Sequence, residues 1–247
     1  MAEMTINGID ISVYNARLLD FSVSGTTVTN STLAASNMLR MLLLVSTIPG
    51  TRTLSVTLTF FPRRTGDNSR NTSIPDRLAT AAENITRFEG LIVGKTVEIS
   101  LPDGYMYTAI VQTLPAATFD GSGEHDVTYT FIAIRHKLTV TQKIVSGGFV
   151  FCESNTTTPC IISATFNTVS NPDTTSKVKL QDIIIKNVSA GSNIVIDGVN
   201  GLITCENSNK FNDSNLIEFP MLQPGKNIIT AVPADADITV TYTPIYV

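Results

Sequence analysis

The chain has 247 residues, of which 43% are apolar and 15% are charged, and its formal net charge is −4. Such a chain can bury one large core or two ordinary ones, so a disordered protein is not expected. The acidic balance disfavours a nucleic-acid-binding protein, which normally carries a basic patch or a high pI. The low density of charge is a hint that part of the surface is covered in an assembly.

The N-terminal stretch "MAEMTINGIDISVYNARLLDF" starts with an acidic residue and has no continuous apolar core, so we expect no secretory signal. The longest apolar run, residues 38–45, is broken by Arg40 and is too short to span a bilayer. We therefore expect a chain that is made and folded in a cytoplasm.

The first half of the chain is rich in strand patterns. Residues 53–60, "TLSVTLTF", alternate apolar and hydroxyl side chains with a period of two. Residues 97–112 predict a hairpin whose turn is Pro102-Asp103-Gly104. Residues 126–134, "DVTYTFIAI", predict a further strand that is buried on both faces at its end.

One segment of this half has helical spacing instead. Leu78, Ala82, Ile85, Phe88 and Ile92 recur at intervals of three or four residues. Ser73-Ile74-Pro75-Asp76 before them is typical of a helix N-terminus, and a glycine at 90 or 94 can end the helix. The pattern predicts one helix over about residues 74–92.

The most basic stretch is the connection over residues 60–76, which contains three arginines. We expect a solvated loop, and the alternative is a contact between subunits, where arginine is favoured for bidentate pairing. The candidate interface residues are Arg63, Arg64 and Arg70.

A search for chemistry gives no candidate active site. His125 lies in the glycine-rich stretch "DGSGEHD", which we expect to be a solvated loop rather than a metal site. The sequence contains no nucleophile elbow, HExxH motif or EF-hand loop. We predict no catalytic residue, no cofactor and no metal, and hence no enzyme.

Three cysteines, Cys152, Cys160 and Cys205, match no zinc-binding spacing, and their odd number suits no disulfide framework. We expect buried free thiols, with a Cys152–Cys160 bridge as the alternative.

The second half consists of short apolar stretches separated by Gly, Pro, Asn and Asp, and the regular spacing of these predicted strands indicates a sandwich. In "DITVTYTPIYV", Ile238, Val240 and Tyr242 share one face, and Pro244 places the strand at an edge or marks its end. The chain has no tryptophan for stacking sugar rings. Core packing is therefore the better account of each aromatic residue of this half: Phe149, Phe151, Phe166, Phe211, Phe219, Tyr242 and Tyr246.

The stretch "LIEFPMLQPGKNIITAV", residues 216–232, contains a Gly-Lys pair beside an apolar segment. A phosphate-binding loop would need a glycine five residues earlier, where Pro220 stands, and a Ser or Thr after the lysine, where Asn227 stands. Pro224-Gly225 instead suits the central positions of a type II turn. We predict a turn here.

Basic residues divide the chain into two modules. All nine arginines lie in residues 1–138, whereas residues 139–247 contain six lysines and no arginine. The predicted fold class is mainly β, with a β-barrel-like module of residues 1–138 that contains one α-helix and a β-sandwich of residues 139–247.

Two stretches resemble the distal tail proteins of long-tailed, non-contractile phages. The opening "INGIDIS…LLDFSVSG" is similar to the start of that family, and residues 216–247 are similar to its closing segment. The second similarity is carried by a pattern F-P-x-L-x-P-G-x-N and a final Y-x-P, here Phe219, Pro220, Leu222, Pro224, Gly225, Asn227, Tyr242 and Pro244.

This resemblance implies a structural protein of the virion that forms a hexameric ring at the tail tip. Such a ring joins the tail tube protein to the tip, baseplate and receptor-binding proteins, with DNA passing through its lumen without specific binding. The resemblance also implies a galectin-like or jelly-roll sandwich at the C-terminus, with residues 219–227 as its anchor and turn. A carbohydrate-binding adhesion module is the alternative function.

Overall fold

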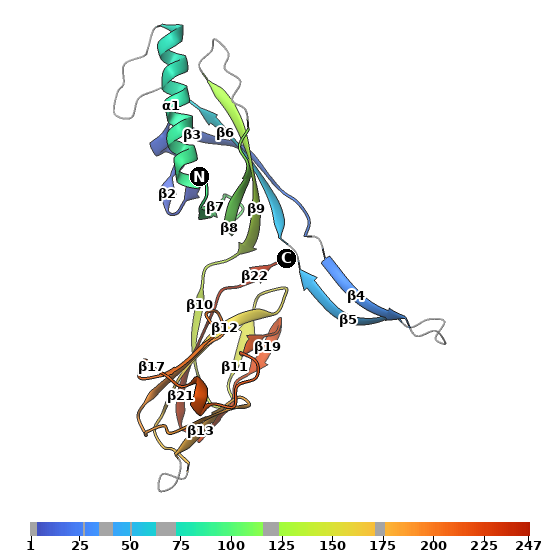
Figure 1. Cartoon of the computed structure of the whole chain (residues 1–247), viewed down its shortest axis with the longest axis vertical. Coiled ribbons are helices and arrows are strands. Elements are labelled where there is room, and N and C mark those ends of the chain that lie inside the picture. Colours follow the sequence, from blue (N-terminus) through green and yellow to red (C-terminus); the bar gives the residue numbers. More distant parts are fainter. Residues whose placement is uncertain are drawn as a thin grey trace. The chain divides into compact units, whose positions relative to one another are not determined.

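The structure is a computed structural model that describes residues 4–26, 28–34, 42–49, 51–62, 73–115, 124–170 and 176–247. The chain divides into two compact units, Met1–His136 with Val247 and Lys137–Tyr246 (Figure 1). The described residues are mainly β with one α-helix, which confirms the predicted fold class. No helix in the described ranges has the length and apolarity that a membrane span requires.

The first unit is built on an antiparallel sheet in which the strands follow the order β2-β1-β7-β8-β9-β6-β3. A separate hairpin of β4 and β5 pairs over its whole length. The elements of this unit are β1 (Thr5–Ile6), β2 (Ile9–Asp10), the 3₁₀ turn η1 (Ile11–Tyr14), β3 (Ala16–Val23), β4 (Val28–Ala34), β5 (Leu42–Pro49), β6 (Arg52–Phe60), α1 (Ile74–Ile92), β7 (Thr96–Ser100), β8 (Met106–Thr113) and β9 (His125–His136).

The core of the first unit lies between this sheet and α1 (Figure 1). Strand β6 turns Leu54, Val56, Leu58 and Phe60 inward, as its period of two predicts. From α1, Phe88 meets Phe60 and Tyr129 with ring centroids 5.6 Å and 5.1 Å apart. These edge-on and tilted aromatic pairs fix how the helix packs on the sheet.

The helix begins and ends where the sequence predicts. The Ser73 hydroxyl accepts a hydrogen bond from the Asp76 amide at 3.2 Å and donates one to the Asp76 carboxylate, so one exposed N–H group is satisfied. At the other end the Lys95 ammonium donates to the Gly90 carbonyl at 2.9 Å, and Gly94 has a φ of 67° that ends the helix.

Two details of β9 differ from the sequence-based expectation. His125 is only 2% exposed and stands opposite Phe60 in the sheet, so it is not part of a solvated loop. The reason is that the inward alternation of Val127 and Tyr129 extends two residues further towards the N-terminus. At the other end, Ile132 and Ile134 are 41% and 46% exposed, so the strand is not buried on both faces within one chain.

The second unit is a sandwich. Its larger sheet has the strand order β10-β21-β12-β15-β16-β17, with β18 paired to β12. The unit also contains a three-stranded sheet β14-β13-β20 and a ribbon β11-β19. The elements are β10 (Val140–Val145), β11 (Phe149–Cys152), β12 (Thr158–Phe166), β13 (Lys177–Leu180), β14 (Ile183–Lys186), β15 (Asn193–Asp197), β16 (Leu202–Cys205), β17 (Ser208–Asn209), the 3₁₀ turn η2 (Phe211–Asp213), β18 (Met221–Leu222), β19 (Gly225–Ile228), β20 (Ala231–Val232), β21 (Ala236–Tyr242) and β22 (Ile245–Tyr246).

Strand β21 is an internal strand of the larger sheet, between the edge strand β10 and β12, and turns Ile238, Val240 and Tyr242 into the core. Pro244 follows the end of this strand, so the second of the two predicted roles for this proline is the one observed. Strands β19 and β20 belong to one run of chain, which pairs first with β11 and then with β13.

The three cysteines are free and buried, as expected from their number and spacing. Burial raises the pKa of the Cys160 thiol to about 12, with a further contribution from the neighbouring Cys152. A thiol with so high a pKa carries almost no thiolate at neutral pH, which makes it unreactive.

Candidate interaction surfaces

The anchor predicted at residues 219–222 sits against the core of the sandwich. Leu222 is 2% exposed and pairs with Thr158 of β12. Phe219 is half-buried against the core. Its ring lies 3.7 Å from the position that a Cβ atom on residue 201, which is Gly201, would occupy. The Pro220 carbonyl accepts the Cys160 S–H at 3.5 Å and comes so close to Gly198 that only glycine fits there.

The turn that follows is held by one side chain. The side-chain Oδ1 of Asn227 accepts a hydrogen bond from the Gln223 N–H at 2.8 Å. Its side-chain Nδ2 donates to the Gln223 and Gly225 carbonyls at 2.7 Å and 3.0 Å. Gly225 has a φ of 88°, the left-handed conformation that a type II turn requires, and Pro224 precedes it in an exposed position. This arrangement gives a physical reason for both Gly and Asn in the motif.

We expect Gly225→Val to destabilise the sandwich by about 1–3 kcal/mol. The space around Gly225 is open to a Cβ atom, so the cost arises from the positive φ and not from a clash. Lys226→Ala is the matched control and should change the melting temperature little, because Lys226 is exposed. Equal melting temperatures for Gly225→Val and the wild type would contradict the turn.

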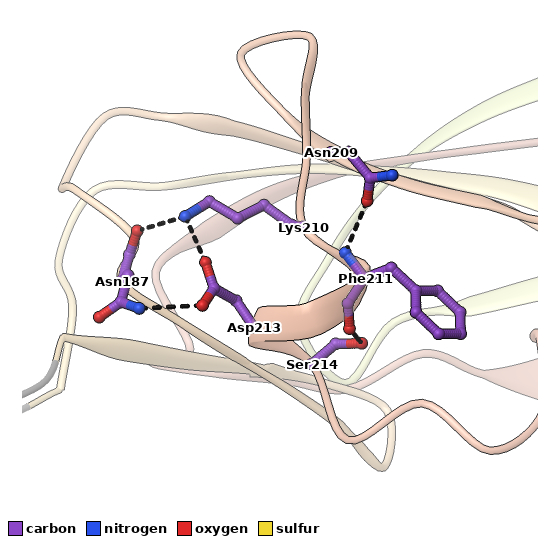
Figure 2. A network of polar contacts seen from close by, with 6 residues as sticks. All are labelled: Asn187, Asn209, Lys210, Phe211, Asp213 and Ser214. Atoms are coloured by element: carbon purple, nitrogen blue, oxygen red, sulfur yellow. Dashed lines mark hydrogen bonds and ion pairs between the residues drawn. The ribbon is translucent and has the colours of Figure 1, made fainter.

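A polar network ties the turn η2 to the loop after β14 (Figure 2). The Lys210 ammonium lies 2.7 Å from the Asp213 carboxylate and donates to the Asn187 carbonyl at 3.1 Å. The Asn187 side chain completes the ring by donating to the other Asp213 oxygen at 3.0 Å. The Asn209 side chain accepts the Phe211 N–H, and the Phe211 ring points away from the network (Figure 2).

Because of this network, the stability of the folded protein should vary with pH in the acid range. Hydrogen bonds from Lys210 and then from Asn187 hold the pKa of Asp213 below its ordinary value of 3.8, and the charge of Lys186 acts in the same direction. A lowered folded-state pKa stabilises the protein at pH values above 3.8, and this contribution is lost as the pH falls through the lowered value.

We therefore expect Asp213→Asn to melt below the wild type at neutral pH, with a difference that shrinks as the pH falls below about 4. Thermal melts of both proteins between pH 7 and pH 2.5 measure this difference. A gap in melting temperature that is constant across this range would show that the charge of Asp213 does not matter.

The other sequence-based candidates have different outcomes. Arg63, Arg64 and Arg70 lie outside the described residues, so their role stays a prediction. Three aromatic residues that we assigned to the core are instead exposed: Phe149 by 49%, Phe151 by 59% and Phe211 by 49%. Within the described part of the chain, no group of three His, Cys, Asp or Glu side chains could hold a metal ion.

The outward face of the first sheet also carries apolar side chains that the sequence did not single out. Ile110 of β8 stands directly opposite Ile132 of β9, and Ile134 follows on the same face. Their side chains are 52%, 41% and 46% exposed. A cluster of this kind on a sheet face is typical of a surface that another protein covers.

The C-terminal unit matches a known protein family. Residues 153–246 match the family model described as the C-terminal domain of the siphovirus-type tail component. The resemblance to the distal tail proteins that the sequence suggested is confirmed for this part of the chain. No curated protein matches the sequence.

Solved structures extend the likeness in fold to the whole chain. The Dit protein of phage SPP1, described as a paradigm of the hub of the adsorption apparatus in phages that infect Gram-positive bacteria, has 16% sequence identity, a TM-score of 0.71 and 99% coverage of both chains. Two structures of the phage p2 baseplate in its activated conformation, with Sr and with Ca, have TM-scores of 0.42 and 0.43. Their identities are 11% and 12%, with coverage of 97% and 98% of both chains. At a TM-score of 0.71, the chain has the fold of the SPP1 Dit protein.

Proposed function

We propose that this protein is a structural hub of a phage tail tip, where six copies form a ring. The ring joins the tail tube protein to the tail-tip, baseplate and receptor-binding proteins, and DNA passes through its lumen without specific recognition. In this role the protein is assembled in the host cytoplasm, becomes part of the virion and catalyses no reaction.

The observation that carries the proposal is the match of residues 153–246 to a siphovirus-type tail component. The fold of the full chain supports it, because the SPP1 protein with this fold is described as a hub of an adsorption apparatus.

Two features of the first unit suit it to ring formation. A closed ring needs two different complementary faces on each subunit. The exposed cluster of Ile110, Ile132 and Ile134 offers one apolar face. The hairpin of β4 and β5 offers a second surface for contact between subunits. Among the described residues each of these strands pairs only with the other. Because a lone hairpin is marginally stable in water, we expect it to pack against another subunit.

Negative-stain microscopy and light scattering on the purified full chain test the proposal. We expect annular particles whose mass is six times that of one chain. A monomer that binds cell-wall saccharides would instead favour the carbohydrate-binding adhesion module.

A further inference from the structure

The second unit has an outer face in which lysine and apolar side chains are interleaved. It is formed by the ribbon β11-β19 and the sheet β14-β13-β20, whose side chains alternate between the core and the exterior. Four lysines and five apolar residues point outward from these strands, and we call this surface the lysine face: Lys177, Lys179, Lys186, Lys226, Phe149, Phe151, Ile184, Ile228 and Val232.

The strand registers show that the lysine face is continuous. Phe149 stands opposite Ile228, and Phe151 stands opposite Lys226. Residues 226, 228, 230 and 232 are all exposed along one run of chain, which carries the face from β19 to β20. Val232 then stands opposite Lys179 on β13, and Lys179 stands opposite Ile184 on β14.

The apolar part of the lysine face is extensive and hollowed. Phe149, Phe151, Ile228 and Val232 are between 49% and 59% exposed. At the Val232 end of the face, Lys177, Lys179, Ile184 and Val232 help to line a hollow of about 190 Å³. Exposed apolar surface with a depression of this kind marks an interaction site more often than ordinary protein surface.

The charge on the lysine face is predominantly positive, although Lys186 also acts at longer range on the Asp213 carboxylate. Lys179 forms an ion pair with Asp182 at 3.3 Å, whereas Lys177, Lys186 and Lys226 have no carboxylate within ion-pair distance among the described residues. Lys177 stands directly opposite Lys186, a like-charge pair that costs stability. This arrangement is notable in a chain whose net charge is −4. A partner that brings carboxylates to the face would relieve the repulsion.

We propose that the lysine face is the docking site for an acidic polypeptide segment of another tail protein, one that combines Asp or Glu with apolar side chains. This inference rests on the proposed function and names the chemistry of one of its contacts. Opposite charges select the segment and orient it, while burial of the phenylalanine and aliphatic side chains supplies the affinity.

The chemistry of the face favours a polypeptide over a sugar chain or a nucleic acid. The Lys226 ammonium lies 4.8 Å from the centre of the Phe149 ring, so one side of this ring is already covered and is closed to stacking by a sugar or a base. The branched side chains of Ile228 and Val232 provide no planar platform and no partner for the hydroxyl groups of a saccharide. Aliphatic side chains of a peptide fit such a surface.

Carbodiimide treatment of purified tail particles tests the proposal, because this reagent joins lysine amines to carboxylates only where the two are in contact. Mass spectrometry should show amide links from Lys177, Lys186 or Lys226 to Asp or Glu of a different tail protein. Lys143, which is exposed on β10 of the opposite sheet, is the matched control and should give no such link.

Charge reversal provides the second measurement. In tails that carry Lys177→Glu with Lys226→Glu, we expect the cross-linked partner to be depleted at least tenfold, whereas Lys143→Glu tails should retain it. A melting temperature of the purified double variant that is no lower than that of the wild type shows that the sandwich is intact, since Lys177→Glu also removes the repulsion between Lys177 and Lys186.

The possible failures can be told apart. If the protein is absent from tail particles, the proposed function is wrong. If the protein is present in the tail but these lysines link to nothing, or only to other copies of the same chain, the docking proposal is wrong. Tails whose lysine face binds an anionic wall polymer or single-stranded DNA, with loss of binding in the double variant and no protein link, would also overturn it.

Discussion

We expect a fragment of residues 1–136 to form rings with the same number of subunits as the full chain, and a fragment of residues 137–247 to be folded and monomeric. The cut falls between the two compact units. Lys137 belongs with the second fragment, since its N–H donates to the Pro244 carbonyl and its ammonium pairs with Glu153.

The physical reason is the location of the surfaces that can join subunits. Ile110, Ile132, Ile134 and the β4–β5 hairpin all lie in the first fragment, together with all nine arginines of the chain. Arginine is the cation best suited to pairing across an interface. Light scattering on both fragments decides the matter. A monomeric first fragment beside an oligomeric second one would mean that the roles of the two units are reversed.

We expect Phe88→Ala to destabilise the first unit by about 3–5 kcal/mol and to abolish the proposed ring. Phe88 is fully buried and contacts the rings of Tyr14, Phe60 and Tyr129, so its removal leaves a cavity that this packing cannot fill. A loss of this size is a large part of the stability of an ordinary domain, about 5–15 kcal/mol.

Denaturant unfolding followed by circular dichroism measures the effect on each unit. The transition of the first unit should move to lower denaturant, while that of the second unit stays in place, since the second unit has its own core. Phe151→Ala is the control, because this ring is 59% exposed and its loss should cost little. Rings of normal stability in Phe88→Ala would show that α1 contributes little to the first unit.

The elements that could be predicted are those in which pattern and end signals agree. Helix α1 occupies Ile74–Ile92, where apolar spacing, the Ser73 cap and a late glycine indicate the same boundaries. Strand β6 has apolar residues on one face and mostly hydroxyl residues on the other, so only one orientation buries its apolar face. In the motif at residues 219–227, Pro-Gly shows the turn, but the three hydrogen bonds of Asn227 could not be inferred from spacing.

The wrong assignments arise where both faces of a strand are apolar. In "FVFC" of β11, either Phe149 and Phe151 or Val150 and Cys152 could face the core, and the alternation does not distinguish these orientations. In the structure the smaller side chains, Val150 and Cys152, face the core. The end of β9 has the same ambiguity, since its outward isoleucines look like core residues and are exposed in the single chain.

The position of β21 between β10 and β12 has a consequence for synthesis. Strand β21 fills the position between β10 and β12, although those strands precede it by about a hundred and about eighty residues in the chain. The sandwich cannot close until translation has passed Tyr242, and pairing over such distances is slow. Chains that end prematurely therefore leave β12 with an open edge and expose a core that proteases and chaperones recognise. Folding that waits for its last strands thus leaves incomplete chains open to degradation.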